Sequence, residues 1–346
     1  MRIFNKKPFL IAEIGRNIYD IAKKEDIGYL DAAKLLINEA KSCGVNAVLL
    51  YSFKAENIIA QNVSFDVDWI SSAFDFQLDF FKNYDKLDGR DFKELKQYCD
   101  ELDILFLVSP LDFESVDELD ELLSMYVISS ADLTNLPFIE YIALKNKPIL
   151  LETGGSTMRE IKQAVNLIED VSICDIAIFH GILSYPTEYS DANLLMIKDL
   201  INQFPDYEIG YFDYTDTNVF VLTTAYNYGA DILIKPFTLD KSISNHSYSM
   251  DCHDVREFRE NINFLSKING YSNKQPVISE SSSLKAYRKS IVAKKDIKKG
   301  EVIDKSHLTF KSPSLGISPQ EINRVIGKTA VTDIKSGSIL YFDMIN

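Results

Sequence analysis

Short apolar runs recur along the first two thirds of the chain, and each ends in a polar or turn residue. The first run leads into Glu13 and Gly15, with Asn17 close behind. A continuous apolar run bounded by turn residues is typical of a strand buried on both faces. The pattern predicts strands at 9–15, 46–52, 104–110, 125–130, 148–153, 176–179, 208–214 and 231–237.

Segments with apolar residues at helical spacing separate these runs. In 29–43, for example, Leu30, Ala33 and Leu36 fall on one face. Further helices are predicted from Asp91 to Cys99, after Ser156 or Thr157, and at about 114–123, 191–203, 217–228 and 254–267. The charged segment 19–28 is interpreted as a loop.

This alternation of strands and helices predicts a parallel α/β fold. Eight such units in about 270 residues favour a (β/α)8 TIM barrel, whose chemistry lies where the strands end. A doubly wound open sheet is the alternative, and the lack of a G-x-G-x-x-G motif after the first strand weakens it. The long connection 55–90 is either a lid over the barrel or an irregular excursion beside it, and its aromatic residues include Trp69, Phe74, Phe76, Phe80 and Phe81.

The composition changes near residue 270. Segment 271–287 is polar and rich in turn residues, which predicts a linker. Short strands and glycines follow from 288 to 346 and predict a compact β-rich domain, which would be marginally stable alone and is expected to dock on another surface. The sequence therefore predicts a barrel domain at 1–270, a linker at 271–287 and a small domain at 288–346.

The charge and the apolar segments narrow the range of partners. A formal net charge of -14 disfavours nucleic acid and anionic membrane surfaces. No apolar segment approaches the roughly 18 residues that span a bilayer. The four cysteines form no C-x-x-C pair and are interpreted as reduced thiols. Together with the absence of a visible signal peptide, these features predict a cytoplasmic protein.

Several motifs resemble the sialic acid synthase family. In the barrel they are Ala12-Glu13-Ile14-Gly15-Arg16-Asn17, Ser52-Phe53-Lys54-Ala55-Glu56-Asn57, Asp132-Leu133-Thr134-Asn135-Leu136-Pro137, Tyr185-Pro186-Thr187 and Phe237-Thr238-Leu239-Asp240. In the tail, which resembles the antifreeze-like (SAF) domain of that family, they are Arg288-Lys289-Ser290-Ile291-Val292-Ala293, Asp296-Ile297-Lys298-Lys299-Gly300-Glu301, Gly316-Ile317-Ser318-Pro319 and Ile326-Gly327-Lys328.

The resemblance implies a TIM barrel followed by an SAF domain, and a role in nonulosonic acid biosynthesis. The family condenses phosphoenolpyruvate with an N-acyl-mannosamine-type sugar to a nine-carbon 2-keto acid, with a divalent metal that is usually manganese. It forms homodimers in which the SAF domain of one chain covers the barrel mouth of the other. The resemblance thus implies a homodimer with a sugar or 2-keto acid as ligand.

The metal ligands of the family are replaced here. Its histidines at the ends of the last two barrel strands correspond to Tyr214 and Pro236. Proline has no side-chain donor atom, and a neutral phenol is a poor ligand for a hard divalent ion. No metal and no other cofactor is therefore predicted.

The phosphate contacts of the family are replaced as well. Its lysines on the second and fourth strands correspond to Leu49 and Val127, and its serine on the seventh strand to Phe212. The serine on the fifth strand corresponds to Glu152, whose charge would repel phosphoenolpyruvate. So many changes at one site predict that the family reaction is lost.

Three residues remain candidates for catalysis. Glu13 resembles the family's acid/base, or it is a buried carboxylate paired with a lysine or arginine. Asp213 is a second acid or a hydrogen-bond acceptor at the strand end. Lys235, expected at an inner strand end, either forms a Schiff base with a carbonyl compound or pairs with Glu13 or Glu152.

The candidate substrate-binding residues are Asn17, Lys54, Ser130, Tyr185 and His246. Arg16 adds a positive charge that, with Lys54, could bind a different anion, although cations on loops are commonly solvated. His180 is expected to pack locally.

Three functions stay open at this point. The first is a divergent protein that binds a nonulosonic acid, a sugar precursor or an active paralogue as its non-catalytic partner. The second is a metal-free aldolase or lyase that uses Lys235. The third is the family activity, retained by a route that the sequence does not reveal.

Overall fold

The computed structural model describes residues 3–4, 7–61, 63, 76–216 and 218–346. It divides into two compact units, Met1–Ile268 and Asn269–Asn346. Among the described helices, none is long and apolar enough to cross a membrane.

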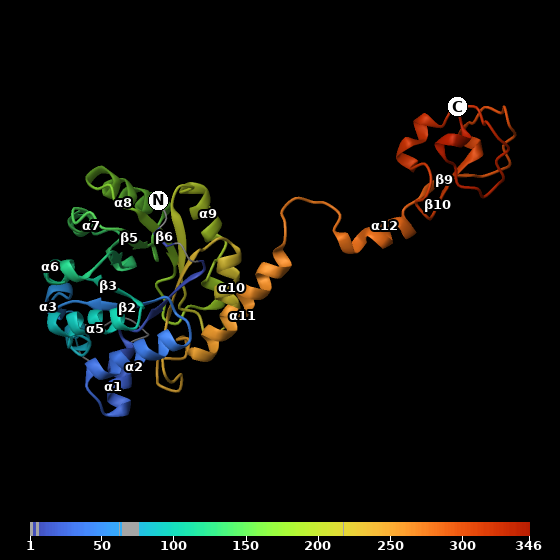
Figure 1. Cartoon of the computed structure of the whole chain (residues 1–346). Coiled ribbons are helices and arrows are strands. Elements are labelled where there is room, and N and C mark those ends of the chain that lie inside the picture. Colours follow the sequence, from blue (N-terminus) through green and yellow to red (C-terminus); the bar gives the residue numbers. More distant parts are fainter. Residues whose placement is uncertain (1–2, 5–6, 62, 64–75, 217) are drawn as a thin grey trace. The chain divides into compact units, whose positions relative to one another are not determined.

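Unit 1 is a closed barrel of eight parallel strands, so the predicted TIM barrel is confirmed (Figure 1). The sheet order is β3-β2-β1-β8-β7-β6-β5-β4. The barrel closes between β3 and β4, where Ser109 Oγ donates to the carbonyl oxygen of Val127 at 2.9 Å. The strands are β1 Phe9–Glu13, β2 Ala47–Ser52, β3 Leu105–Pro110, β4 Tyr126–Ile128, β5 Ile149–Glu152, β6 Ile176–Gly181, β7 Glu208–Phe212 and β8 Ile232–Pro236.

Helices surround the strands on the outside (Figure 1). They are α1 Asn17–Glu25, α2 Tyr29–Ser42, α3 Ala55–Ile58, α4 Gln77–Phe81, α5 Gly89–Glu101, α6 Phe113–Leu119, α7 Leu136–Ala143, α8 Met158–Val171, α9 Met196–Gln203, α10 Val219–Asn227 and α11 Cys252–Asn269. The helix predicted at 191–203 therefore begins later, at Met196, and a short 3-10 turn at Tyr189–Asp191 precedes it.

Alternate residues of each strand face two different cores. In β1, Leu10 and Ala12 pack outward against the helices, whereas Phe9 and Ile11 fill the barrel interior. This follows from the two-residue period of a strand. The interior at the carboxyl ends of the strands is where a ligand site forms.

The segment predicted as a charged loop at 19–28 is mostly helix, which corrects that prediction. Helix α1 buries Ile18, Ile21 and Ala22, which recur at helical spacing, while Lys23 and Lys24 lie in its last turn. The run of charges after Ala22 hid this short apolar face, because only one turn and a half of the helix is buried.

Two helix N-termini are set by capping boxes. Thr157, one of the two caps predicted for α8, accepts a hydrogen bond from the backbone N–H of Glu160. The Glu160 side chain in turn accepts one from the backbone N–H of Thr157. For α5 the cap is Asp88 rather than Asp91, which instead accepts from the backbone N–H of Asp88 at 2.9 Å.

Only part of the predicted lid at 55–90 can be assessed. Helices α3 and α4 lie within it, whereas 62 and 64–75, with Trp69 and Phe74, fall outside the described residues. Whether the connection is a lid therefore stays a prediction.

Unit 2 contains an antiparallel pair, β9 Ser290–Ala293 with β10 Leu308–Lys311, and several isolated bridges. It has a hydrophobic core of its own, which includes Ile291, Ile303 and Leu340. The segment predicted as a linker contains helix α12 Ser281–Tyr287, which buries none of its residues.

Candidate ligand site at the barrel mouth

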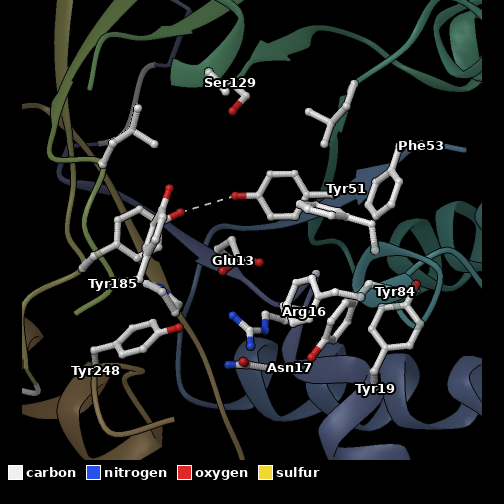
Figure 2. Close-up of a pocket in the computed structure, with 18 residues that line it drawn as sticks. Glu13, Arg16, Asn17, Tyr19, Tyr51, Phe53, Tyr84, Ser129, Tyr185 and Tyr248 are labelled. Atoms are coloured by element: carbon white, nitrogen blue, oxygen red, sulfur yellow. Dashed lines mark hydrogen bonds between the residues drawn. The ribbon is translucent and has the colours of Figure 1, made fainter. Parts of the chain in front are cut away.

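A cavity of about 330 Å³ lies at the carboxyl ends of the barrel strands (Figure 2). Its described lining is largely aromatic. It combines the carboxyl ends of β1 and β2 and the segments that follow them with residues from the later strands and their loops. The lining residues are Glu13, Gly15, Arg16, Asn17, Tyr19, Tyr51, Phe53, Phe80, Phe81, Tyr84, Leu111, Ser129, Ala131, Leu183, Tyr185, Tyr214, Pro236 and Tyr248.

Glu13, the last residue of β1, is the acid of this cavity. Its side chain is buried, and its Oε1 has no hydrogen-bond partner among the described residues. Burial raises the pKa of Glu13 from its ordinary value to about 7, although the backbone N–H groups of Gly15 and Arg16 oppose the rise. Glu13 can therefore be present in both protonation states near neutral pH, as an acid/base group requires.

A second buried carboxyl group, Glu152 at the end of β5, is not among the described lining residues. Its Oε2 accepts from the backbone N–H of Ser130 at 3.3 Å, and its Oε1 has no partner in the described part of the chain. Burial and the charge of Glu13 raise the pKa of Glu152 to about 8. The barrel interior thus disfavours a second negative charge.

Tyrosines occupy the space between the strand ends. The hydroxyls of Tyr51 and Tyr214 lie 3.4 Å apart, and the Tyr214 ring stacks on Phe212 with centroids 4.3 Å apart. Burial raises the pKa of both hydroxyls well above the ordinary value. They are therefore neutral groups that donate and accept hydrogen bonds.

Gly15 allows this packing. A Cβ atom at residue 15 would lie 2.6 Å from Cδ2 of Tyr51 and 3.0 Å from Oε1 of Glu13. The glycine of the first motif therefore lets the Tyr51 ring approach the backbone next to Glu13.

Lys235 and Asp213 lie on the outer side of the barrel and outside the described lining, which corrects the prediction of an inner position for Lys235. Both are fully buried, and Lys235 Nζ donates to Asp213 Oδ2 and to the carbonyl oxygen of Thr215, each at 2.8 Å. The predicted partners Glu13 and Glu152 are thus wrong. The physical reason is register, because inward-facing Phe212 and Ile234 put residues 213 and 235 on the helix side.

Asp213 acts as a hydrogen-bond acceptor at the strand end. Its Oδ1 accepts from the backbone N–H of Thr215 at 3.0 Å, from Thr215 Oγ1 at 2.8 Å and from the Tyr211 hydroxyl at 3.2 Å. These bonds and the Lys235 ion pair satisfy the buried carboxylate completely, as a buried charge requires.

The predicted substrate-binding residues divide into two groups. Asn17 and Tyr185 line the cavity, whereas Lys54, Ser130 and His246 lie outside the described lining. Asn17 Nδ2 also donates to the carbonyl oxygen of Phe237 at 2.9 Å and so ties the first strand end to the last.

The other three make local bonds. The backbone N–H of Lys54 donates to Asp112 at 2.7 Å, and Ser130 Oγ accepts from the N–H of Gly154 at 2.9 Å. Buried His246 bonds Thr238 through Nδ1 at 2.7 Å. His180 packs locally as predicted, with Nε2 at 2.8 Å from the carbonyl oxygen of Ala192.

The described lining does not fit the manganese ion of the family. It offers one carboxylate, Glu13, and neither an imidazole nor a thiol, while a hard divalent ion needs several oxygen or nitrogen ligands. Tyr214 and Pro236, which the motif resemblance assigns to the family's histidine positions, both line the cavity.

Elsewhere in the described chain, donor atoms of Asp251, His253 and Asp254 lie within 4.8 Å of one another. Lys241 already pairs with both aspartates, and Asp251 Oδ1 caps α11 by accepting from the backbone N–H of His253 at 2.8 Å. This cluster is explained by helix capping.

Sequence reasoning missed most of the aromatic wall. Tyr19, Tyr84 and Tyr248 come from three distant segments and belong to none of the motifs. Their only signal was the high tyrosine content, 18 in 346 residues, which does not indicate where the rings meet.

The fold and the cavity define a (β/α)8-barrel protein with a ligand site at the strand ends and a small β-rich unit after the barrel. The chain belongs to the NeuB family, whose model matches residues 36–274, and an SAF domain matches residues 288–346.

Two curated relatives match almost the whole chain. The uncharacterized protein MJ1065 of Methanocaldococcus jannaschii is 34% identical over 338 residues, which cover 97% of this chain and 94% of the relative. The N,N'-diacetyllegionaminic acid synthase of Campylobacter jejuni is 34% identical over 343 residues, which cover 97% of this chain and 99% of the relative.

A solved structure supports the fold over the same range. The putative spore coat polysaccharide biosynthesis protein E from Chromobacterium violaceum aligns with a TM-score of 0.79 at 20% identity, covering 98% of this chain and 100% of that one. The chain is thus a sialic acid synthase-like protein with an SAF domain, in a family of nonulosonic acid synthases.

Proposed function

We propose that this protein binds a sugar or 2-keto acid of nonulosonic acid biosynthesis at the barrel mouth but does not carry out the manganese-dependent condensation of phosphoenolpyruvate. The observation that carries the proposal is that Tyr214 and Pro236, which the motif resemblance assigns to the family's histidine positions, both line the cavity. A phenol that burial keeps neutral and a proline supply no adequate metal ligand.

The interior of the barrel also argues against phosphoenolpyruvate. Leu49, Val127 and Phe212 stand where the family has two lysines and a serine, and all three are buried in the apolar interior cluster. Glu13 and Glu152 add two carboxyl groups there. A phosphate and a carboxylate bound at that place would be desolvated beside these acids with Arg16 as the one cationic side chain of the described lining, whereas such an anion needs several cations.

In this proposal Glu13, Asn17 and Tyr185 contact the ligand, and Glu13 is the group suited to proton transfer. The alternative of a metal-free aldolase that uses Lys235 has little support, because a fully buried ammonium paired with Asp213 cannot reach a carbonyl compound in the cavity. The second candidate that we retain is a non-catalytic partner of an active paralogue, which the same missing ligands favour.

A cytoplasmic homodimer completes the proposal. Its support is the family resemblance, in which the SAF domain of one chain covers the barrel mouth of the other, and the aromatic residues of the 55–90 connection that line the cavity.

The test is calorimetric titration of metal-stripped protein with phosphoenolpyruvate, with and without Mn²⁺. We expect no binding up to millimolar concentration in either case. The Campylobacter jejuni legionaminic acid synthase, treated identically, is the positive control. Micromolar, manganese-dependent binding by this protein would show that the family activity is retained, and a screen of N-acyl sugars for condensation would follow.

A further inference from the structure

Arg16 forms no ion pair with a carboxylate among the described residues, although Glu13 and Asp20 lie close enough for their charges to act on it. It lies half-buried in the cavity lining, and its Nε is buried without a hydrogen-bond partner among the described residues. Its guanidinium stands over the rings of Phe80 and Tyr84, 5.5 Å and 5.2 Å from their centroids. The two rings thus hold the guanidinium by cation–π contacts, which leave its N–H donors available to another group.

The guanidinium nitrogens are directed into the cavity. Figure 2 shows the Arg16 nitrogens between Glu13 and Asn17, toward the side of Tyr248. A side-chain hydrogen bond to Tyr84 accounts for only part of its donor capacity, since a guanidinium carries five N–H donors. A buried donor without a partner is costly, so the site is suited to an anionic acceptor that is supplied from outside.

The walls around Arg16 restrict what such an anion can be attached to. Tyrosine rings from several segments surround the space and present both apolar faces and neutral hydroxyls. A hydroxylated ring meets both requirements, because its C–H faces pack on aromatic rings and its hydroxyls bond phenols. The cavity of about 330 Å³ can hold one such ring with its substituents.

The charge balance favours a single negative charge. Arg16 is the one cationic side chain in the described lining, and Glu13 lies in the same cavity with Glu152 near it. A carboxylate matches the planar fork of the guanidinium, whereas the further charge of a phosphate would face the two acids without a second cation.

We propose that Arg16 is the anion-recognition residue of the barrel mouth and that it selects a cyclic sugar acid with one carboxylate over phosphorylated ligands. This inference rests on the proposed function, since it assigns the ligand class to the same cavity. Arg16 is not a position at which the family resemblance supplies a cation. The chain therefore carries an anion contact of its own in place of those lost at Leu49 and Val127.

The test compares N-acetylneuraminic acid with its methyl ester, which has the same ring but no carboxylate charge, by calorimetry on the full-length protein. We expect the acid to bind at least about tenfold more tightly than the ester, as a charge-assisted hydrogen-bonded pair requires. Equal affinities, or no binding of the acid up to millimolar concentration, would overturn the inference.

Variants assign the effect to Arg16. Arg16→Met should lose at least about tenfold in affinity for the acid and leave the affinity for the ester unchanged, and Arg16→Lys should lie between it and the wild type. Lys23→Met removes an exposed positive charge from helix α1, which Arg16 directly precedes, and should change neither affinity. If Arg16→Met binds the acid like the wild type, the inference is wrong. If this variant fails to fold by circular dichroism, the ester comparison and Arg16→Lys still decide the question.

These outcomes are separate from those of the proposed function. Manganese-dependent binding of phosphoenolpyruvate would refute the proposed function without altering the comparison of acid and ester. Conversely, equal binding of acid and ester would refute the role of Arg16 while the loss of the family reaction still stands.

Discussion

Two buried carboxyl groups, Glu13 and Glu152, dominate the chemistry of the barrel mouth at the scale of single residues. The pKa of Glu13 is raised to about 7 and that of Glu152 to about 8, in both cases chiefly by burial. Because each group holds its proton longer in the folded state than in the unfolded chain, the folded protein binds more protons between about pH 4.5 and 8.

Folding stability should therefore fall as the pH rises through this window. The contribution of the two groups to stability is fully present below pH 4.5 and is lost as the pH rises through about 7 for Glu13 and about 8 for Glu152. For each group the loss is roughly 1.4 kcal/mol for every unit by which its pKa differs between the folded and the unfolded state. Urea unfolding at several pH values from 5 to 8.5 measures this slope. The double variant Glu13→Gln with Glu152→Gln should flatten it, whereas Glu257→Gln, at an exposed residue, should not. A stability that rises over this range in the wild type would contradict the shifts.

The proposed loss of two imidazole ligands can be tested by introducing histidines. Tyr214→His combined with Pro236→His would place two nitrogen ligands in the cavity that holds Glu13, so the double variant should gain binding of Mn²⁺. Electron paramagnetic resonance of added Mn²⁺ reports the bound fraction directly. The matched control, Tyr214→Phe with Pro236→Ala, opens similar space without donors and should bind no more than the wild type. If the wild type itself binds Mn²⁺ as tightly as the histidine variant, the account of the missing ligands fails.

At the scale of elements, local sequence rules explain several helix boundaries. The capping box at Thr157 satisfies backbone donors at the start of α8. Thr157→Ala should lower the free energy of unfolding by about 1 kcal/mol. Ser156→Ala is the control, because Ser156 Oγ makes only a long contact of 3.5 Å with the carbonyl oxygen of Gly154. Chemical denaturation of both variants gives the comparison, and equal destabilisation would show that Thr157 has no special role.

The strands were predictable because each barrel strand is buried on both faces and appears as an apolar run, as in Phe9–Glu13. Helix α1 was missed because its buried face is only a few residues long. The predicted bounds of the last barrel strand were right within a residue or two. The position of Lys235 was nevertheless misjudged, because a difference of a single residue in register decides whether a side chain faces inward or outward.

The aromatic wall of the cavity lay beyond sequence reasoning for another reason. Tyr19, Tyr84 and Tyr248 come from segments that follow three different strands, and no spacing rule relates them. What the sequence did predict at this site were residues at a strand end or in the segment that follows it, namely Glu13, Asn17 and Tyr185, since a closed parallel barrel brings all strand ends to one rim.

At the scale of the whole molecule, the chain consists of two units with separate cores. The smaller one, Asn269–Asn346, is of a size that is marginal in isolation, which is consistent with the proposed homodimer in which it docks on a barrel. Light scattering coupled to size-exclusion chromatography at micromolar concentration should give twice the chain mass of 39.4 kDa. A mass of one chain under these conditions would contradict the dimer.

The outward pair Lys235–Asp213 and the inward pair Pro236–Tyr214 stand on the same two strand ends. Lys235 and Asp213 are fully buried on the helix side of the barrel, whereas Pro236 and Tyr214 line the cavity. Tolerance to substitution should therefore alternate along this rim, with a period of two residues. A saturation scan scored for folding alone should reject most changes at 213 and 235 and accept many at 214 and 236. Such a barrel can exchange one chemistry for another while its scaffold stays intact, which makes this rim a natural place for new ligand specificity to arise.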